Sequence, residues 1–298
     1  PGILLLALHA TRRLLHHYGF DLLCAMLVGL WRIPSVRAID VATIVLFVHA
    51  LLALWSVGER IVGRGMGVAA AALVMFGAGL PFTCGETLAL AQAAGTHVLS
   101  NCVRGAVGEN PPLIAYFFQH PWSLGLPLAL SCLLILAGDG LGWPWLRLGC
   151  LACLLAALCL TQTALFCALA AALPVSELLD ERREPWRRRA VIALVLLVTA
   201  VGAVSLLGAF WAPPRVLGSR LTLHFGIADD ARQSFGWMWG TFGLLPLGAV
   251  GAFWLERRRV LFVALAVGGA VVINAVRYTD TWDVVKFASV ASIGFAVG

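Results

Sequence analysis

Four charged residues that could bind an anion lie close together near the C-terminal end of the sequence. They are Arg277, Asp280, Asp283 and Lys286, and Lys286 is the only lysine among 21 basic residues (Lys and Arg). Two cations and two carboxylates in so short a segment suit the binding of a phosphodiester and the handling of a proton. The spacing by itself names no reaction.

Lys286 lies where a polar loop runs into the apolar segment 287–298. The N-terminus of a helix carries a partial positive charge, so a cation in its first turns is unfavourable unless an anion lies nearby. Asp283, three residues earlier on the same helical face, could supply that anion, and so could the phosphate of a substrate. A lysine that reaches the membrane–water boundary is the alternative interpretation, and both stay open.

Further polar residues stand at predicted helix boundaries or inside apolar segments. Glu86 could act as a general base or a metal ligand, or could compensate the charge at a helix N-terminus. His120 could donate to a phosphate or carry a proton, or could be structural. Asp229-Asp230 could bind a divalent cation, or could begin a helix. Asp40, Gln162 and Asn274 are candidate polar sites or interhelical hydrogen-bonding residues.

The elements that hold these residues must be membrane-spanning helices. Hydrophobic residues make up 61% of the chain and charged residues 12%, whereas a soluble domain carries about 25% charged residues. The mean hydropathy is +0.92. The net charge of +6 does not indicate nucleic-acid binding, because most of the arginine lies in short loops, where it sets the topology. We expect no nucleic-acid partner.

The sequence predicts an all-α fold, a polytopic transmembrane helix bundle with short paired helices and a long extracytoplasmic loop. We expect a single transmembrane domain over 1–298, with about nine to eleven apolar segments, no separate soluble domain, and truncation at both ends. The apolar segments are 2–9, 20–31, 39–57, 66–82, 123–137, 148–175, 190–211, 238–255, 260–276 and 287–298.

Arginine counting predicts the orientation of the chain. The loops 176–189 and 256–259 are rich in arginine and should be cytoplasmic, which places 212–237 and 277–286 outside. Segment 148–175 is long for one crossing, and Thr161-Gln162-Thr163 interrupts it. Two short helices there would place the loop 83–122 outside as well, whereas one tilted helix would make that loop cytoplasmic. The arginine distribution favours two helices.

The eight cysteines do not form the pattern of a dense disulfide framework. Cys150 and Cys153 lie in an apolar segment, where cysteine behaves as a small hydrophobic residue. Cys84 and Cys102 lie in one long loop and could form a disulfide if that loop faces an oxidising compartment.

The stretch Trp282-Asp283-Val284-Val285-Lys286-Phe287, at the outside start of a late helix, resembles the motif of polytopic GT-C-type glycosyltransferases. The short paired helices, the long outside loop and the stretch from Asn110-Pro111-Pro112 to Gln119-His120-Pro121 are similar too. The resemblance implies transfer of a sugar from a polyprenyl-phosphate donor to a glycan or protein acceptor outside the cytoplasm, by direct displacement at the anomeric carbon.

The resemblance also implies residue roles. Lys286 would contact the lipid phosphate and Asp283 would orient it, while a carboxylate deprotonates the acceptor hydroxyl. These enzymes usually carry an acidic pair in their first outside loop, and the chain has no such pair before residue 83, so Glu86 stands as the substitute. Glu86 and Asp283 are therefore the predicted catalytic residues. The predicted substrate-binding residues are Lys286, Arg277, Asp280, His120 and Trp282. No cofactor is certain, and a divalent metal is possible.

The leading hypothesis is a multi-pass glycosyltransferase of a bacterial inner membrane, in contact with membrane lipid. The alternative is a transporter or flippase for an anionic or lipid-linked substrate, because ionisable groups in membranes also line transport pathways. The charges cluster at one interface and no internal repeat is visible, which ranks transport second. A non-catalytic scaffold subunit is the third reading.

Overall fold

The structure is a computed structural model that describes nine parts of the chain. These are residues 19–76, 120–138, 144–179, 185–207, 221–223, 238, 241–255, 258–278 and 286–298. The chain divides into two compact units, one formed by Pro1–Val57 and Phe117–Gly218, the other by Gly58–Tyr116 and Ser219–Gly298. The single transmembrane domain stays a prediction.

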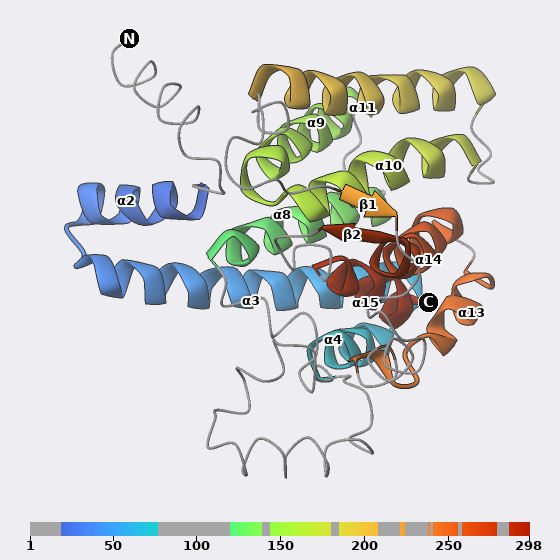
Figure 1. The fold of residues 1–298 in the computed structure, drawn as a ribbon, viewed down its shortest axis with the longest axis horizontal. Helices are drawn as coiled ribbons and strands as arrows, with labels where there is room; N and C mark the ends of the chain where they lie inside the picture. Colours follow the sequence, from blue (N-terminus) through green and yellow to red (C-terminus); the bar gives the residue numbers. More distant parts are fainter. Residues whose placement is uncertain are drawn as a thin grey trace. The chain divides into compact units, whose positions relative to one another are not determined.

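The described part of the chain is helical apart from one short antiparallel pair of strands (Figure 1). The all-α prediction is therefore confirmed in its coarse form. Most predicted apolar segments coincide with a helix. An apolar segment has no polar surroundings to bond its backbone, and a helix satisfies those backbone groups within the segment.

The first unit contains six helices in its described residues. Their bounds are α2 Gly19–Trp31, α3 Ser35–Ile61, α8 His120–Ala137, α9 Pro144–Thr161, α10 Thr163–Leu179 and α11 Trp186–Leu207; α3 belongs to this unit up to Val57. Helices α9 and α10 both pack against α11, and α8 packs against α2 and α9. Phe20 and Cys24 of α2 meet Ala38 and Ala42 of α3 in one buried cluster.

The segment 148–175 is interrupted at Gln162, as the sequence predicts. Helix α9 ends at Thr161 and α10 begins at Thr163. The side-chain oxygen of Gln162 accepts a hydrogen bond from the backbone N–H of Ala164 at 3.3 Å. The glutamine therefore acts as the cap of α10, a role that a polar side chain fills when a helix starts anew. The side of the membrane on which the loop 83–122 lies stays a prediction.

The second unit is built around α15. Its elements are α4 Met66–Phe76, β1 Leu221–Leu223, α13 Leu247–Ala252, α14 Arg259–Ala275, β2 Val276–Tyr278 and α15 Phe287–Val297, together with the last turn of α3. Helix α15 packs against α14, α13 and α4. All its residues from Ala288 to Val297 are buried, so it is the central helix of this unit.

Small residues allow the neighbours of α15 to approach its backbone. A Cβ added to Gly269 of α14 would lie 2.8 Å from the backbone nitrogen of Ala291, and one added to Gly294 would collide with the backbone of Ala266. Gly248 has the same relationship to the carbonyl of Phe295. In a lipid environment the hydrophobic effect does not drive helices together, and close packing through small residues stabilises their association instead.

The expectation of one apolar helix over 238–255 is wrong. The described residues of this segment are helical at 238 and 241–242, form a turn over 243–246, and then form α13, a helix of six residues. Gly243 has a φ of 52°, in the left-handed region, and Pro246 precedes the helix. A residue with positive φ and a proline interrupt a helix however apolar its sequence is.

Among the described helices, two are long and apolar enough to cross a membrane. They are Ser35–Ile61 and Trp186–Ser205, with hydropathies of 2.2 and 1.8. In the second of these helices only 22% of an 18-residue stretch is buried, and its exposed residues include Leu194, Val198 and Val201. Exposed apolar faces of this extent are typical of contact with lipid or another protein. These helices support a membrane association for the chain.

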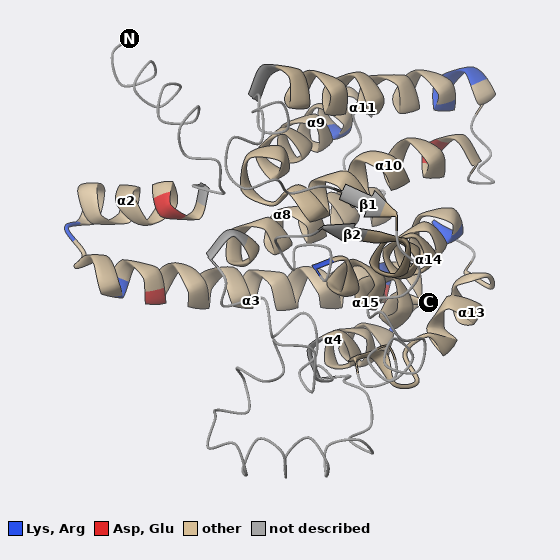
Figure 2. Cartoon of the chain, viewed as in Figure 1, with Lys and Arg blue, Asp and Glu red and all other residues tan. Residues whose placement is uncertain are grey.

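Figure 2 shows that the charged residues are sparse and that several lie near helix ends. Basic residues mark the first turn of α11, where Arg187, Arg188 and Arg189 follow Trp186, and the turn between α2 and α3 at Arg32. Tryptophan and arginine together at the end of an apolar helix are typical of a membrane boundary.

Candidate functional site

The structure describes Lys286, Arg277 and His120 among the predicted site residues. Lys286 immediately precedes α15 with helical backbone angles (φ −61°, ψ −24°), and its side chain is half-buried. Arg277 is the central residue of β2, and His120 is the first residue of α8 in the other unit. The other four predicted residues, Glu86, Asp280, Trp282 and Asp283, lie outside the described residues.

The strand pair brings together two loops that the sequence places on the same side. Thr222 of β1 is the register partner of Arg277 in β2, and Leu221 is the partner of Tyr278. Strand β1 lies within the loop 212–237, and β2 leads into the segment that ends at Lys286. These two short parts of the chain therefore pair, and the pairing holds the backbone of Arg277 beside that of Thr222.

Lys286 stands at the start of a helix with an unusual polar content. The first turn of α15 has no acidic residue. Ser289 and Ser292 are fully buried, and neither hydroxyl oxygen has a hydrogen-bond partner. Buried hydroxyls normally find a partner, so each of these two is an unfavourable polar group in an apolar core.

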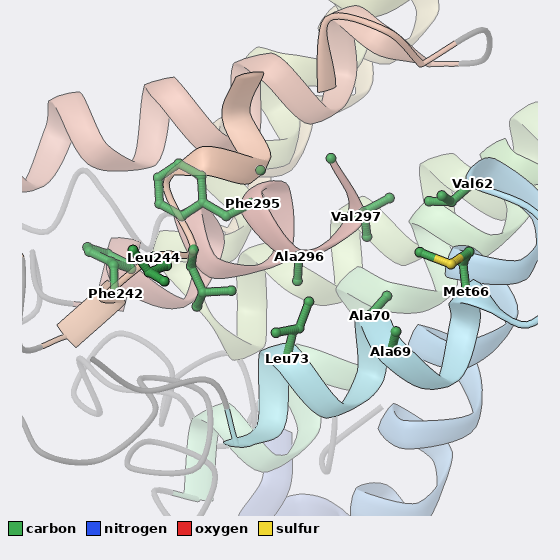
Figure 3. Close-up of a pocket in the computed structure, with 13 residues that line it drawn as sticks. Val62, Met66, Ala69, Ala70, Leu73, Phe242, Leu244, Phe295, Ala296 and Val297 are labelled. Atoms are coloured by element: carbon green, nitrogen blue, oxygen red, sulfur yellow. The ribbon is translucent and has the colours of Figure 1, made fainter. Parts of the chain in front are cut away.

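The far end of α15 borders an apolar pocket of about 400 Å³ within the second unit (Figure 3). Met66, Ala69 and Leu73 line it from α4 and its start, and Phe295, Ala296 and Val297 line it from α15. Figure 3 shows Leu73 and Ala70 directed toward Ala296 and Val297. Every lining residue is apolar or glycine. A lining of this kind suits an apolar ligand.

Helix α15 connects Lys286 to this pocket. Its 11 residues span about 16 Å at about 1.5 Å per residue. That length is about half the thickness of the hydrocarbon core of a bilayer. A cation at one end and an apolar pocket at the other suit an amphiphile with an anionic head and a hydrocarbon chain.

The first unit contains a second polar feature, at the interruption between α9 and α10. Gln162 is 1% exposed, and its side-chain nitrogen Nε2 has no hydrogen-bond partner. Gly125 of α8 faces it so closely that a Cβ on the glycine would collide with the Cβ of Gln162. The interruption is thus packed tightly against α8 and keeps an unsatisfied amide donor.

A hydrogen bond between α3 and α8 was not predicted from the sequence. The Nε2 atom of His49 lies 3.1 Å from the hydroxyl oxygen of Ser131, and that hydroxyl donates to the carbonyl of Pro127 at 2.8 Å. A hydroxyl has one hydrogen to donate, so the histidine is the donor of the first bond. An ionisable side chain within an apolar helix was the only signal available in the sequence.

Asn274 lies within α14, as the sequence placed it. Its side-chain nitrogen donates to the carbonyl of Ala270 at 2.9 Å and contacts the sulfur of Met238 at 3.4 Å. One of these bonds is within its own helix, and the other joins α14 to Met238 of a different segment, in agreement with the hydrogen-bonding interpretation.

Within the described ranges, no three His, Cys, Asp or Glu side chains gather as a metal site. Asp229-Asp230 and the pair Cys84 and Cys102 lie outside those ranges. The six described cysteines are free thiols in helices, with Cys132 and Cys159 buried and Cys153 exposed.

Comparisons with protein-family models, with curated proteins and with solved structures found no match to this chain. A functional assignment therefore rests on the chemistry of its own residues.

Proposed function

We propose that this chain is the membrane core of a glycosyltransferase of the GT-C type, which moves a sugar from a polyprenyl-phosphate donor to an acceptor outside the cytoplasm. In this proposal the chain is a multi-pass protein of a bacterial inner membrane. The acceptor is a glycan or a protein.

One observation carries the proposal: α15 joins a cation at its start to an apolar pocket at its end. A polyprenyl phosphate has the matching polarity, with a phosphate at one end and a hydrocarbon chain at the other. The phosphate would lie near Lys286, at the boundary of the membrane, and the chain would extend along α15 toward the pocket. The distance of about 16 Å is compatible with that placement.

The proposed reaction is a single displacement. The acceptor oxygen forms a bond with the anomeric carbon, the bond between that carbon and the phosphate oxygen breaks, and the acceptor proton passes to a carboxylate. Lys286 would stabilise the negative charge that develops on the departing phosphate, since a positioned cation is worth most where charge develops. Glu86 and Asp283 remain the proposed carboxylates, with Arg277, Asp280, His120 and Trp282 as substrate-binding residues.

Transfer of a labelled sugar from a polyprenyl-phosphate donor, by the protein in lipid nanodiscs, tests the proposal. We expect Lys286→Ala to lower the rate by about a hundredfold or more, the effect of removing a charge-stabilising group from an active site. Lys286→Arg should keep part of the activity because it keeps the charge. Arg37→Ala, which removes an exposed arginine from α3, is the matched control and should have no effect. Unchanged glycan transfer by Lys286→Ala in cells that lack the wild-type copy would sink the proposal.

A carrier or flippase is the second candidate, and the interruption at Gln162 favours it. Transporters often bind substrate where a membrane helix is broken. Gln162 supplies a buried amide nitrogen without a hydrogen-bond partner at such a position. Uptake of a polyprenyl-phosphate sugar into proteoliposomes without any covalent transfer would place this candidate first.

A further inference from the structure

We propose that the Ser289 hydroxyl is a second phosphate-binding group, which acts together with Lys286 at the start of α15. This inference rests on the proposed function for the identity of the ligand and adds a residue to its site. The ligand chemistry is a phosphate oxyanion, carried either by a lipid or by free phosphate.

The position of Ser289 supports this role. It lies three residues after Lys286, in the first turn of α15. Residues three apart lie on one side of a helix, and the Cα–Cβ bond of a helical residue is tilted toward the N-terminus. The Cα–Cβ bond of Ser289 is therefore tilted toward the turn that carries Lys286.

The state of the hydroxyl supports it as well. Ser289 is 0% exposed, and its oxygen has no hydrogen-bond partner. An unsatisfied hydroxyl in an otherwise apolar core is unfavourable, and a ligand that accepts its hydrogen would remove that cost. Helix α15 also has no acidic residue in its first turn. The partial positive charge at a helix start, the ammonium and the hydroxyl all favour an anion at this place.

Ser292 provides a matched control. It is also 0% exposed with an unpartnered hydroxyl, but it lies one turn further from Lys286. Ser292→Ala removes the same atom from the same helix at the same burial. A hydroxyl that matters only for packing would behave alike at both positions, whereas a phosphate ligand distinguishes them.

The test is equilibrium binding of farnesyl phosphate to the detergent-solubilised protein, with farnesol and inorganic phosphate as competitors. We expect Ser289→Ala to weaken farnesyl phosphate binding by about tenfold or more, as for a hydrogen bond to a charged group. Lys286→Ala should weaken it at least as much, and Ser292→Ala should leave it unchanged. Size-exclusion profiles and helical content verify that the variants fold.

The competitors identify the source of the phosphate. Competition by inorganic phosphate would show that the oxyanion alone is bound, and resistance to it would assign the site to a lipid phosphate. Equal binding by Ser289→Ala and the wild type, or no binding of farnesyl phosphate by the wild type, would overturn the inference. Binding that depends on Ser289 without any sugar transfer would retain the inference and reject the glycosyltransferase. Sugar transfer by a protein whose binding of farnesyl phosphate does not depend on Ser289 would retain the glycosyltransferase and reject the inference.

Discussion

Gly269 of α14 lies directly against the backbone of α15 at Ala291, where an added Cβ would be 2.8 Å from the backbone nitrogen and 3.0 Å from the alanine Cβ. The two helices can approach this closely only because the residue is a glycine. The contact fixes α15 beside α14, and with it the start of the helix at Lys286.

Gly269→Ala should therefore destabilise the second unit. An inserted methyl group has no space at this position, and overpacking of a core costs about 1–3 kcal/mol. Gly268→Ala is the matched control, since a Cβ there would meet no atom within 4 Å, and it should be neutral or stabilising by up to about 1 kcal/mol. Thermal unfolding of the two variants in detergent measures the difference. Equal midpoints would show that the close contact is absent.

Glu59 fixes the turn between α3 and α4. One of its carboxylate oxygens accepts hydrogen bonds from the backbone N–H groups of Gly65 at 2.9 Å and Gly67 at 3.2 Å. Glu59→Ala leaves these donors at the start of α4 without this acceptor and should cost about 0.5–2 kcal/mol. Glu59→Gln keeps an acceptor oxygen and should cost less. Chemical denaturation provides the measurement, with Asp40→Ala, an exposed acid of the same helix, as the control. A loss as large for Asp40→Ala would argue against the capping role.

The pocket beside α15 can be filled from α4. Ala69 lines it, and Ala69→Phe should occupy part of its volume and weaken the binding of farnesol and farnesyl phosphate. Ala72→Phe makes the same substitution at an exposed position of the same helix that does not line the pocket, and it should bind both ligands as the wild type does. Tryptophan fluorescence titrations provide the comparison. If Ala69→Phe binds farnesol normally, the hydrocarbon chain lies elsewhere.

The hydrogen bond between His49 and Ser131 should link α3 to α8. Hydrogen bonds between membrane helices contribute about 0.6 kcal/mol on average, so a double-mutant cycle with His49→Ala and Ser131→Ala should give a coupling energy of that size. Thr199→Ala is the control, because the Thr199 hydroxyl donates to the carbonyl of Val195 within its own helix. A coupling energy of zero would mean that the two side chains do not interact in the membrane.

The topology can be tested by labelling single cysteines in a background without the native eight. Leu223 is 87% exposed in β1, and Trp186 is 60% exposed beside the arginines of α11. We expect Leu223→Cys to react with an impermeant thiol reagent from outside, and Trp186→Cys to react only after the membrane is opened. Gln92→Cys decides the side of the loop 83–122. Labelling of Trp186→Cys from outside would invert the predicted orientation. An unlabelled Gln92→Cys beside a labelled Leu223→Cys would place the loop 83–122 in the cytoplasm and would mean that the segment 148–175 crosses the membrane once.

The sequence predicted the features that depend on local composition. Apolar runs predicted the helices α3 and α11, because a helix satisfies its own backbone in an apolar environment. The polar triplet around Gln162 predicted the interruption between α9 and α10, since such residues cap helices more readily than they continue them. The same reasoning failed over 238–255, where hydrophobicity alone concealed the turn at Gly243 and Pro246.

The sequence by itself determined that this chain is helical and apolar, that Lys286 is its only lysine, and that the lysine lies at the start of an apolar segment. Tertiary structure alone decided the pairing of Thr222 with Arg277, the burial of Ser289, and the pocket at the far end of α15. Periodicity and composition predict whether a segment is helical and how apolar it is. Pairing, burial and cavities depend on which distant segments approach, and the approach of α14 to α15 depends on the shape of a few small side chains.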